Sequence, residues 1–323
     1  MSKFAHTHLK IAIIWTGERA IESQAQHNSQ RGGHGALATA ALAVSGCLWG
    51  TGFLFGKMAF QEMTVSENVL WRFVIGSLAL APFLFIRGSK RLDSRAWRLV
   101  LIGGFIGVPV QFLVQFKGLQ LTTVSHAALM VGTLPMMLAL SSVIFLHERL
   151  RVIEWLVLGL SGVGAVLIAT SSSSAGGPAA SARGDAMVVV SLMAAVVMIL
   201  LTKKLVQDYG ALQITIAMIG SGTLMVVIWF LATQPVRFNF SARTWMAAAA
   251  QGLLATAMAY LLWNWGLAWV PASRAGVFLN MEPLVGTILG VIVLKESLGI
   301  LAIVGGAMII GAALYFSRRS GTG

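Results

Sequence analysis

Long apolar segments recur along the whole chain and restrict the fold more than any other feature. Ten of them reach about 20 residues, the length at which a helix rising 1.5 Å per residue crosses a hydrocarbon layer of about 30 Å. The predicted spans cover residues 36–58, 67–86, 99–117, 124–145, 153–171, 185–202, 211–232, 245–265, 274–294 and 298–317. With 57% hydrophobic and 11% charged residues, the chain lacks the polar surface of a soluble globule. We predict an all-α integral membrane protein with ten transmembrane helices.

Basic residues are distributed unevenly between the predicted loops, and this predicts the orientation. The formal charge of +12 comes from bases scattered between apolar segments, so it does not indicate a nucleic-acid surface. If the N-terminal tail is cytoplasmic, sixteen of the 23 Lys and Arg residues lie on the cytoplasmic side and five on the other. Because cytoplasmic loops carry the excess of positive charge, we expect both termini in the cytoplasm and a plasma membrane location, such as the bacterial inner membrane.

Residues 1–35 precede the first span and are interpreted as a disordered cytoplasmic tail. The apolar island "IAIIW" is too short to cross a membrane, and no small-residue cleavage site follows it. The tail contains four of the six histidines, but no cysteine or paired carboxylate accompanies them. We therefore expect neither a metal nor a cofactor.

Two stretches of the chain align without a gap at a separation of 148 residues. "FLVQFKGLQLTTVSHAALMVGTLPMMLALSSVIFLHERL" starts at Phe112, and "YLLWNWGLAWVPASRAGVFLNMEPLVGTILGVIVLKESL" starts at Tyr260. The halves, residues 36–171 and 185–318, are joined by a Ser/Gly-rich linker at 172–184. Because five spans is an odd number, the second half must enter the membrane from the opposite side. Such inverted repeats are typical of transporters that expose one midplane site alternately to each side.

Four segments carry a resemblance to a known family: "LWGTGFLFGKMAF" (48–60), "WRF" (71–73), "TLPMMLALSSVIFLHERL" (133–150) and "NMEPLVGTILGVIVLKESL" (280–298). They resemble EamA-type members of the drug/metabolite transporter superfamily, and the likeness covers residues 37 to 318. The resemblance implies a ten-helix carrier with cytoplasmic termini and a central cavity between the halves, usually an exporter of amino acids or other metabolites. These motifs do not specify the substrate.

Helical spacing predicts which side chains line such a cavity. Trp49, Phe53 and Lys57 form one stripe on the first span, with glycines between them. In the alternative interpretation these glycines pack two helices closely and Lys57 extends outward to the membrane surface. Two further pairs lie one turn apart on the third and eighth spans: Gln111 with Gln115, and Tyr260 with Asn264. Substrate contacts and hydrogen bonds between helices both explain these pairs.

A single carboxylate, Glu282, lies within the apolar run of the ninth span, beside Asn280. Burying it in hydrocarbon costs several kcal/mol unless it is paired or hydrated. Pro283 follows it and removes a backbone donor, and Pro135 occupies the equivalent place in the first half. Paired helix breaks predict a midplane site. Glu282 then recognises substrate or acts as a fixed counter-ion for Arg72 or Lys57, and the two roles are compatible.

Other residues are interpreted structurally. Trp263, Trp265 and Trp269 near the end of the eighth span fit an interfacial aromatic belt. Glu148 and Glu296 each precede a new span, where a carboxylate can cap the N-terminus of a helix.

We therefore predict a secondary transporter that exports amino acids or similar small metabolites by alternating access. The alternatives are an efflux carrier for drugs or toxic compounds and a channel or scramblase built from the same helices. No nucleophile elbow, HExxH motif or P-loop occurs, so we expect neither an enzyme nor direct ATP coupling. The expected partners are a small-molecule substrate and the lipid bilayer, with no nucleic acid, and a monomer is sufficient.

Overall fold

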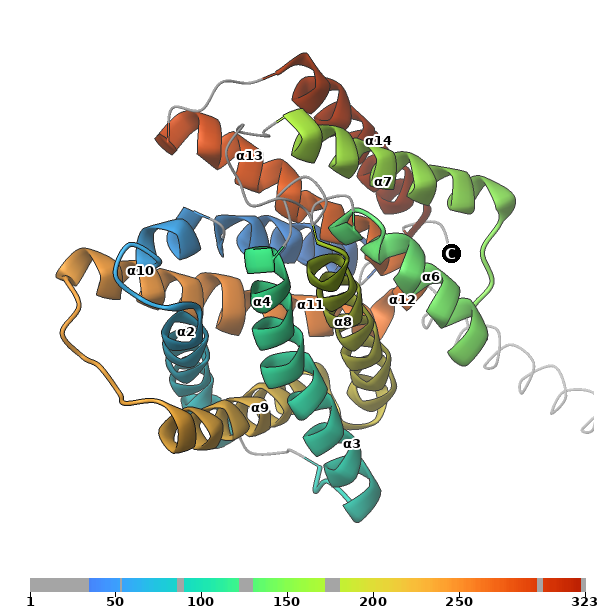
Figure 1. Ribbon diagram of the computed structural model, residues 1–323. Helices are drawn as coiled ribbons and strands as arrows, with labels where there is room; N and C mark the ends of the chain where they lie inside the picture. Colours follow the sequence, from blue (N-terminus) through green and yellow to red (C-terminus); the bar gives the residue numbers. More distant parts are fainter. Residues whose placement is uncertain are drawn as a thin grey trace, which may run out of the picture.

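The computed structural model describes residues 35–52, 54–85, 90–121, 130–171, 181–294 and 299–320, and Figure 1 shows them as a bundle of helices. In chain order the helices are Gly35–Ala59, α2 (Val65–Leu80), η1 (Ala81–Phe85), α3 (Ser94–Phe105), η2 (Ile106–Leu113), α4 (Val114–Leu121), α6 (Leu134–Phe145), α7 (Val152–Ser171), α8 (Ala182–Tyr209), α9 (Ala211–Thr233), α10 (Ala242–Gly252), η3 (Leu253–Met258), α11 (Ala259–Trp269), α12 (Ala272–Ala275), η4 (Gly276–Asn280), α13 (Met281–Leu294) and α14 (Ile300–Ser320). The described residues contain no strand, as the all-α prediction requires.

Among the described residues, seven helical stretches are long and apolar enough to cross a membrane: Gly35–Ala59, Ser94–Gly118, Ala182–Tyr209, Ala211–Thr233, Ala242–Trp269, Ala272–Val293 and Ile300–Arg318. Leu134–Phe145 and Val152–Ile168 are shorter apolar helices. The remaining predicted span is α2, which continues directly as η1, so the two together reach Phe85. The helix α8 begins at Ala182, three residues before the predicted start of the second half at residue 185.

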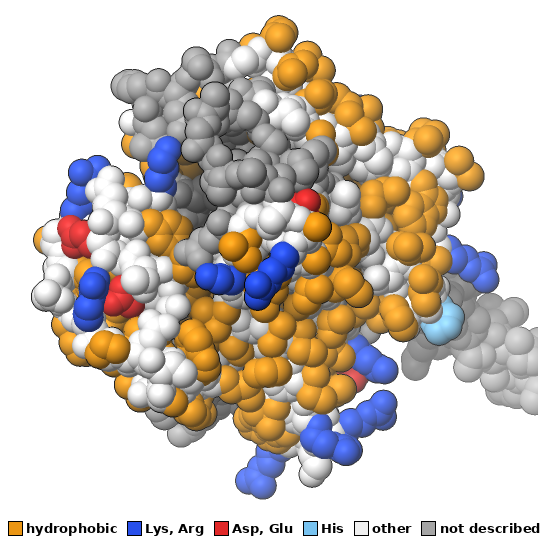
Figure 2. Space-filling view, viewed as in Figure 1, with side chains coloured by type: hydrophobic (Ala, Val, Ile, Leu, Met, Phe, Trp, Pro, Cys, Tyr) orange, Lys and Arg blue, Asp and Glu red, His pale blue; other side chains and the backbone are white. Residues whose placement is uncertain are grey.

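The outer surface is apolar, as a lipid environment requires. Large aliphatic side chains such as Leu78, Ile228 and Ile292 are more than half exposed. Figure 2 shows hydrophobic side chains over much of the visible face. A soluble monomer rarely exposes apolar surface on this scale.

Polar side chains mark several helix starts. Thr64, Asp93, Ser181 and Ser241 each precede a helix and accept a hydrogen bond from a backbone N–H in its first turn. At Thr64 a full capping box forms, because the Glu67 carboxylate accepts the Thr64 N–H at 2.7 Å in return. These short-range signals define where the spans α2, α3, α8 and α10 begin.

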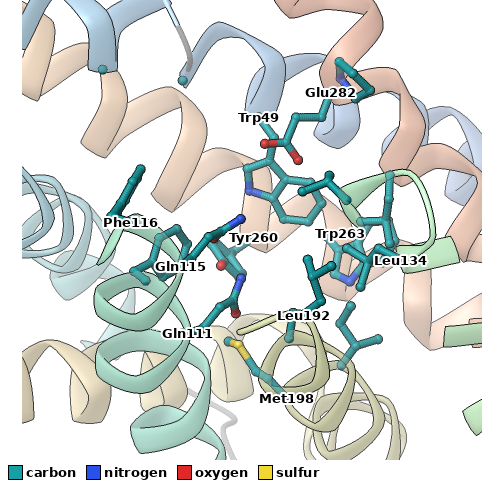
Figure 3. Close-up of a pocket in the computed structure, with 18 of the residues that line it drawn as sticks. Trp49, Gln111, Gln115, Phe116, Leu134, Leu192, Met198, Tyr260, Trp263 and Glu282 are labelled. Carbon is teal, nitrogen blue, oxygen red and sulfur yellow. The ribbon is translucent and has the colours of Figure 1, made fainter. Parts of the chain in front are cut away.

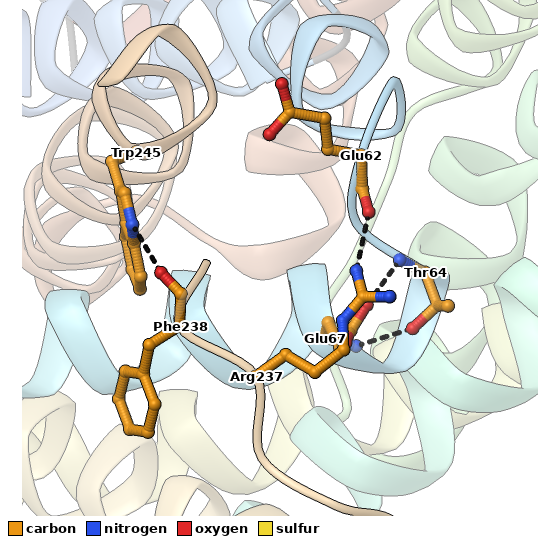
Figure 4. Close-up of polar contacts among 6 residues, drawn as sticks. All are labelled: Glu62, Thr64, Glu67, Arg237, Phe238 and Trp245. Atoms are coloured by element: carbon orange, nitrogen blue, oxygen red, sulfur yellow. Dashed lines mark hydrogen bonds and ion pairs between the residues drawn. The ribbon is translucent and has the colours of Figure 1, made fainter. Parts of the chain in front are cut away.

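The start of α2 is tied to the connection between α9 and α10 (Figure 4). The Arg237 guanidinium lies 2.8 Å from the Glu67 carboxylate and donates to the Glu62 carbonyl at 2.9 Å. The Ser241 N–H donates to the Glu62 carboxylate at 2.7 Å, and this bond lowers the pKa of Glu62 below its ordinary value.

Hydrogen bonds also join α2 and α9 near their opposite ends. The Lys90 ammonium, beyond the end of α2, donates to the Asp208 carbonyl, and the Gln213 amide at the start of α9 donates to the Lys90 carbonyl. The start of α2 therefore lies near the end of α9, and the start of α9 lies near the end of α2. The second helices of the two halves run antiparallel.

Glycines allow close contact at two helix crossings. A Cβ atom on Gly50 would lie 2.7 Å from both the Glu282 carbonyl oxygen and the Val285 Cβ, so the helix Gly35–Ala59 presses directly on α13. On Gly164 a Cβ would lie 2.6 Å from the Gly305 carbonyl oxygen, where α7 and α14 lie side by side (Figure 1). The glycines of the first span thus do pack helices, as one of the two sequence interpretations proposes.

Two π-helical segments interrupt the third and eighth spans. The segment η2 contains Pro109, which cannot donate a backbone hydrogen bond. With the 148-residue shift, η2 falls on residues 254–261 and overlaps η3, although Ala257 stands where the first half has proline. Both halves therefore carry the same irregularity, and π segments of this kind are frequent at functional sites.

Candidate functional site

A central cavity of about 280 Å³ lies between the halves (Figure 3). Its polar and charged lining residues are Arg72, Gln111, Gln115, Thr202, Gln251, Tyr260, Asn264 and Glu282. Its apolar lining residues include Trp49, Phe60, Phe112, Phe116, Leu134, Leu192, Met198 and Trp263. This volume approaches the lower end of small-molecule sites, about 300 Å³.

Seven of the ten predicted substrate-contact residues line this cavity: Trp49, Arg72, Gln111, Gln115, Tyr260, Asn264 and Glu282. Phe53 lies outside the described residues. Lys57 and Asn280 are described, and neither is among the residues that line the cavity.

Lys57 does not line the cavity as predicted, because its side chain points in a different direction around the helix axis from Trp49. The side chain is exposed and lies off the cavity wall. Eight residues after Trp49, an α-helix has turned about 80° away from the starting direction, whereas eleven residues leave only about 20°. Phe60 therefore continues the Trp49 stripe, and it does line the cavity.

Asn280 is used in packing. Its side chain is buried, and the amide donates to the Ser161 hydroxyl at 2.9 Å, which joins η4 to α7. This is the interhelical hydrogen bond that polar residues commonly form inside membranes.

Arg72 is held by the π segment η3. Its Nε donates to the Thr256 hydroxyl at 2.8 Å, and its Nη2 donates to the Ala255 carbonyl at 3.0 Å. In η3 the Ala259 N–H bonds the Leu254 carbonyl five residues back, which leaves the Ala255 carbonyl able to accept from Arg72. The guanidinium also lies over the Phe112 ring, 4.9 Å from its centroid. These hydrogen bonds and the aromatic face give partners to a guanidinium whose side chain is only 7% exposed.

Glu282 faces the same cavity from α13, and Figure 3 shows its carboxylate beside Trp49. Within the described part of the chain, the carboxylate has no hydrogen bond or ion pair, and Arg72 directs its bonds to η3 instead. Arg72 and Glu282 thus form no direct ion pair, although their opposite charges interact across the cavity. The carboxylate is left available to a ligand.

Aromatic rings form one wall of the cavity. The Trp49 ring lies 5.4 Å from Tyr260 and 5.2 Å from Trp263, measured between centroids. Trp263 is only 1% exposed, so it is not part of an interfacial belt as the sequence interpretation held. Its spacing of three residues from Tyr260, which places both on one helix face, was the signal for a cavity position.

Gln251 was not predicted from the sequence. Its amide donates to the Gly52 carbonyl at 3.0 Å, which places it against the first span and beside the cavity. The glutamines of the third span, Gln111 and Gln115, form no hydrogen bond with other described residues, so their amides are available to a solute.

The helix is interrupted just before each of the two prolines at which the sequence predicts a break. Pro135 is the second residue of α6, after a turn at residues 132–133, and Pro283 is the third residue of α13, after the 3₁₀ segment η4. A proline in the first turn of a helix loses no intrahelical bond. Leu134 and Pro283 line the cavity, so both interruptions border it.

Comparison with known proteins decides the family. Residues 36–170 and 182–318 each match the EamA-like transporter family. The chain belongs to this family. The resemblance seen in the sequence is thereby confirmed, and the protein is an integral membrane transporter.

Several relatives align over most of the chain. The uncharacterized transporter YetK of Bacillus subtilis is 26% identical, covering 84% of each chain. An uncharacterized transporter of Archaeoglobus fulgidus is 27% identical over 87% of this chain and 96% of its own. The biotin transporter of Escherichia coli K12 is 23% identical over 87% and 93%. One solved crystal structure superimposes with a TM-score of 0.75 at 19% identity, covering 87% of this chain and 98% of the other, and supports the fold.

Proposed function

We propose that this protein is a secondary carrier that exports small amphoteric metabolites, amino acids first among them, across the plasma membrane by alternating access. The observation that carries the proposal is a cavity that combines one guanidinium, one available carboxylate and an aromatic wall. Ten spans arranged as an inverted repeat, with both termini cytoplasmic, complete the proposal. The antiparallel placement of α2 and α9 supports the inversion.

The charge of the cavity favours a zwitterion. Lys57 does not line the cavity, and the described lining residues include one base, Arg72, and one acid, Glu282. An amphoteric solute therefore adds no net charge to a low-dielectric space. The solute carboxylate would meet Arg72 and the free amides of Gln111 and Gln115. Its amine would meet Glu282, and an apolar side chain would pack on Trp49.

A second candidate substrate class comes from the relatives. One of them is named a biotin transporter, and biotin carries a carboxylate but no basic amine. Such a solute would use Arg72 and leave Glu282 without a partner, so the two classes differ in their dependence on Glu282.

Counterflow into proteoliposomes tests the carrier and its substrate class together. We expect exchange of a zwitterionic amino acid with an apolar side chain, and Glu282→Gln should abolish more than nine-tenths of it. The matched control is Glu62→Gln, an exposed carboxylate at one end of α2, which should exchange normally. Unchanged exchange by Glu282→Gln would refute the amine contact. Biotin exchange that survives Glu282→Gln would favour the carboxylate class, and leakage without exchange would favour a channel.

Reporter fusions test the topology separately. A reporter placed after residue 175 should lie outside the cell, and one placed after residue 207 should lie inside. Finding both on one side would rule out the ten-span inverted arrangement. Greater secretion of the substrate by expressing cells than by control cells tests the direction of transport.

A further inference from the structure

Charged side chains converge on the turn that joins α11 to α12. The Glu148 carboxylate accepts two backbone N–H groups, from Ala272 at 2.9 Å and from Ser273 at 2.8 Å. The Lys203 ammonium donates to the carbonyls of Leu267 and Val270. One acid and one base thus bind the two sides of a single turn.

Each of these contacts satisfies backbone groups that a helix end leaves unpaired. The last carbonyls of α11 accept from a cation, and the first N–H groups of α12 donate to an anion, so both charges have the sign that the helix dipole favours. Glu148 is brought to α12 because His147 adopts a left-handed φ of 55°, which ends α6 and turns the chain. Glu148 thus caps α12 of the other half, whereas the sequence interpretation assigned its cap to the span that follows it.

A third contact joins the halves at the same place. The fully buried Glu154 carboxylate, at the start of α7, lies 2.9 Å from the Arg274 guanidinium of α12. Glu154 also accepts the Arg151 N–H at 2.7 Å, which fixes the carboxylate at the start of its own helix. The first half therefore holds α12 through two separate carboxylates.

These contacts lie next to one end of the cavity. Thr202 and Asn264 line it, while Lys203 follows Thr202 directly and Leu267 lies three residues after Asn264. At this end α8 and α11, which leads into the α11–α12 turn, both border the cavity. In the proposed orientation this is the cytoplasmic end.

We propose that Glu148 and Lys203 form a latch that keeps the cavity closed toward the cytoplasm and must release the α11–α12 turn before that side opens. The inference rests on the proposed alternating-access function. Losing one charge-assisted hydrogen bond shifts an equilibrium about tenfold, so weakening either side of the latch should raise the cytoplasmic-open population by about that factor.

Cysteine labelling in oriented vesicles tests the latch. The only native cysteine is replaced by Cys47→Ser, and Ile199→Cys then places one thiol in the cavity lining. A membrane-impermeant maleimide is applied from each face in turn. We expect Glu148→Gln and Lys203→Gln to speed labelling from the cytoplasmic face about tenfold and to slow it from the other face.

Two matched control variants remove charges of the same signs at residues that do not contact the α11–α12 turn. Lys204→Gln removes an exposed positive charge next to Lys203, which is only 8% exposed. Asp208→Asn removes an exposed negative charge on the same helix, α8. Both should label like the parent. Equal labelling rates in the latch variants and the controls would overturn the proposal.

Folding is checked by size-exclusion chromatography. If Glu148→Gln does not fold, Lys203→Gln carries the test, because it removes different bonds. Failure of both variants to fold would show the contacts to be permanent and would also overturn the latch. Wild-type counterflow is measured in the same vesicles. Its absence would refute the carrier proposal, whereas exchange by the wild type with unaltered labelling in the variants would refute only the latch.

Discussion

Substitution of Gly50 by alanine tests how closely the first span holds the element that carries Glu282. The added Cβ would lie 2.7 Å from the Glu282 carbonyl oxygen and 2.7 Å from the Val285 Cβ. Relief to between 3.0 and 3.4 Å requires the two helices to separate by about 0.3 to 0.7 Å, and both close atoms belong to backbone or Cβ positions that cannot rotate away. Overpacking of this kind costs about 1–3 kcal/mol.

The matched control is Gly220→Ala in α9, where an added Cβ would meet no atom within 4 Å. Alanine is favoured over glycine in a helix by about 1 kcal/mol, so this variant should be as stable as the parent or slightly more stable. For domains of 150–250 residues, 1 kcal/mol corresponds to about 2–4 °C in the unfolding midpoint. We therefore expect Gly50→Ala to lose its monodisperse peak several degrees below the control when detergent-solubilised samples are heated.

Transport should fall in the same variant, because the displaced helix carries the Glu282 carboxylate. Counterflow by Gly50→Ala is compared with counterflow by Gly220→Ala at matched surface expression. Equal midpoints and equal exchange rates in the two variants would show that the first span and α13 are not in the tight contact described here.

Three further predictions concern the ends of helices. Glu67→Gln should lower the free energy of unfolding by about 1–2 kcal/mol, because the carboxylate completes a helix cap. Arg237→Gln should lower it by under about 1 kcal/mol, since the Arg237 side chain is 46% exposed. A lower thermal unfolding midpoint for Arg237→Gln than for Glu67→Gln would contradict this. The pKa of Glu62 is lowered by folding, so its contribution is present above the ordinary value of 4.5 and is lost as the pH falls through the lowered pKa. Acid should therefore increase hydrogen exchange in the α9–α10 connection, and Glu62→Gln should show that increase already at pH 7. Pro135→Ala and Pro283→Ala should insert normally but exchange substrate slowly, and wild-type exchange would show that the interruptions are incidental.

Hydropathy was sufficient to predict where the helices lie, because the requirement for apolar length is local. Apart from the turn at residues 132–133, the described residues of the predicted spans are helical, and boundaries such as Ala182 moved by a few residues. Helical spacing then predicted much of the cavity, since both predicted pairs, Gln111 with Gln115 and Tyr260 with Asn264, line it. The same reasoning failed for Lys57, where eight residues exceed two turns by enough to rotate the side chain off the stripe.

The environment of Arg72 could not be predicted because it depends on a backbone irregularity. Pro109 hints at the π segment in the third span, but the eighth span has Ala257 at that position and no comparable signal. Without η3 there is no reason to expect the Ala255 carbonyl to accept from a side chain. Arg72 therefore looked like a counter-ion for Glu282, whereas its hydrogen bonds go to the eighth span.

The two halves share their backbone irregularities but not their charged residues. Both carry a π segment at equivalent positions and a helix interruption before a proline. This duplication suits the proposed alternating-access carrier, in which each half would adopt the other's conformation when the cavity opens to the opposite side. Glu282, however, corresponds to Leu134, an apolar residue that also lines the cavity. A solute recognised through these charges must keep one orientation while the backbone around it alternates. Under the proposed function, the duplicated elements would serve movement, and the single copies of Arg72 and Glu282 would serve substrate selectivity.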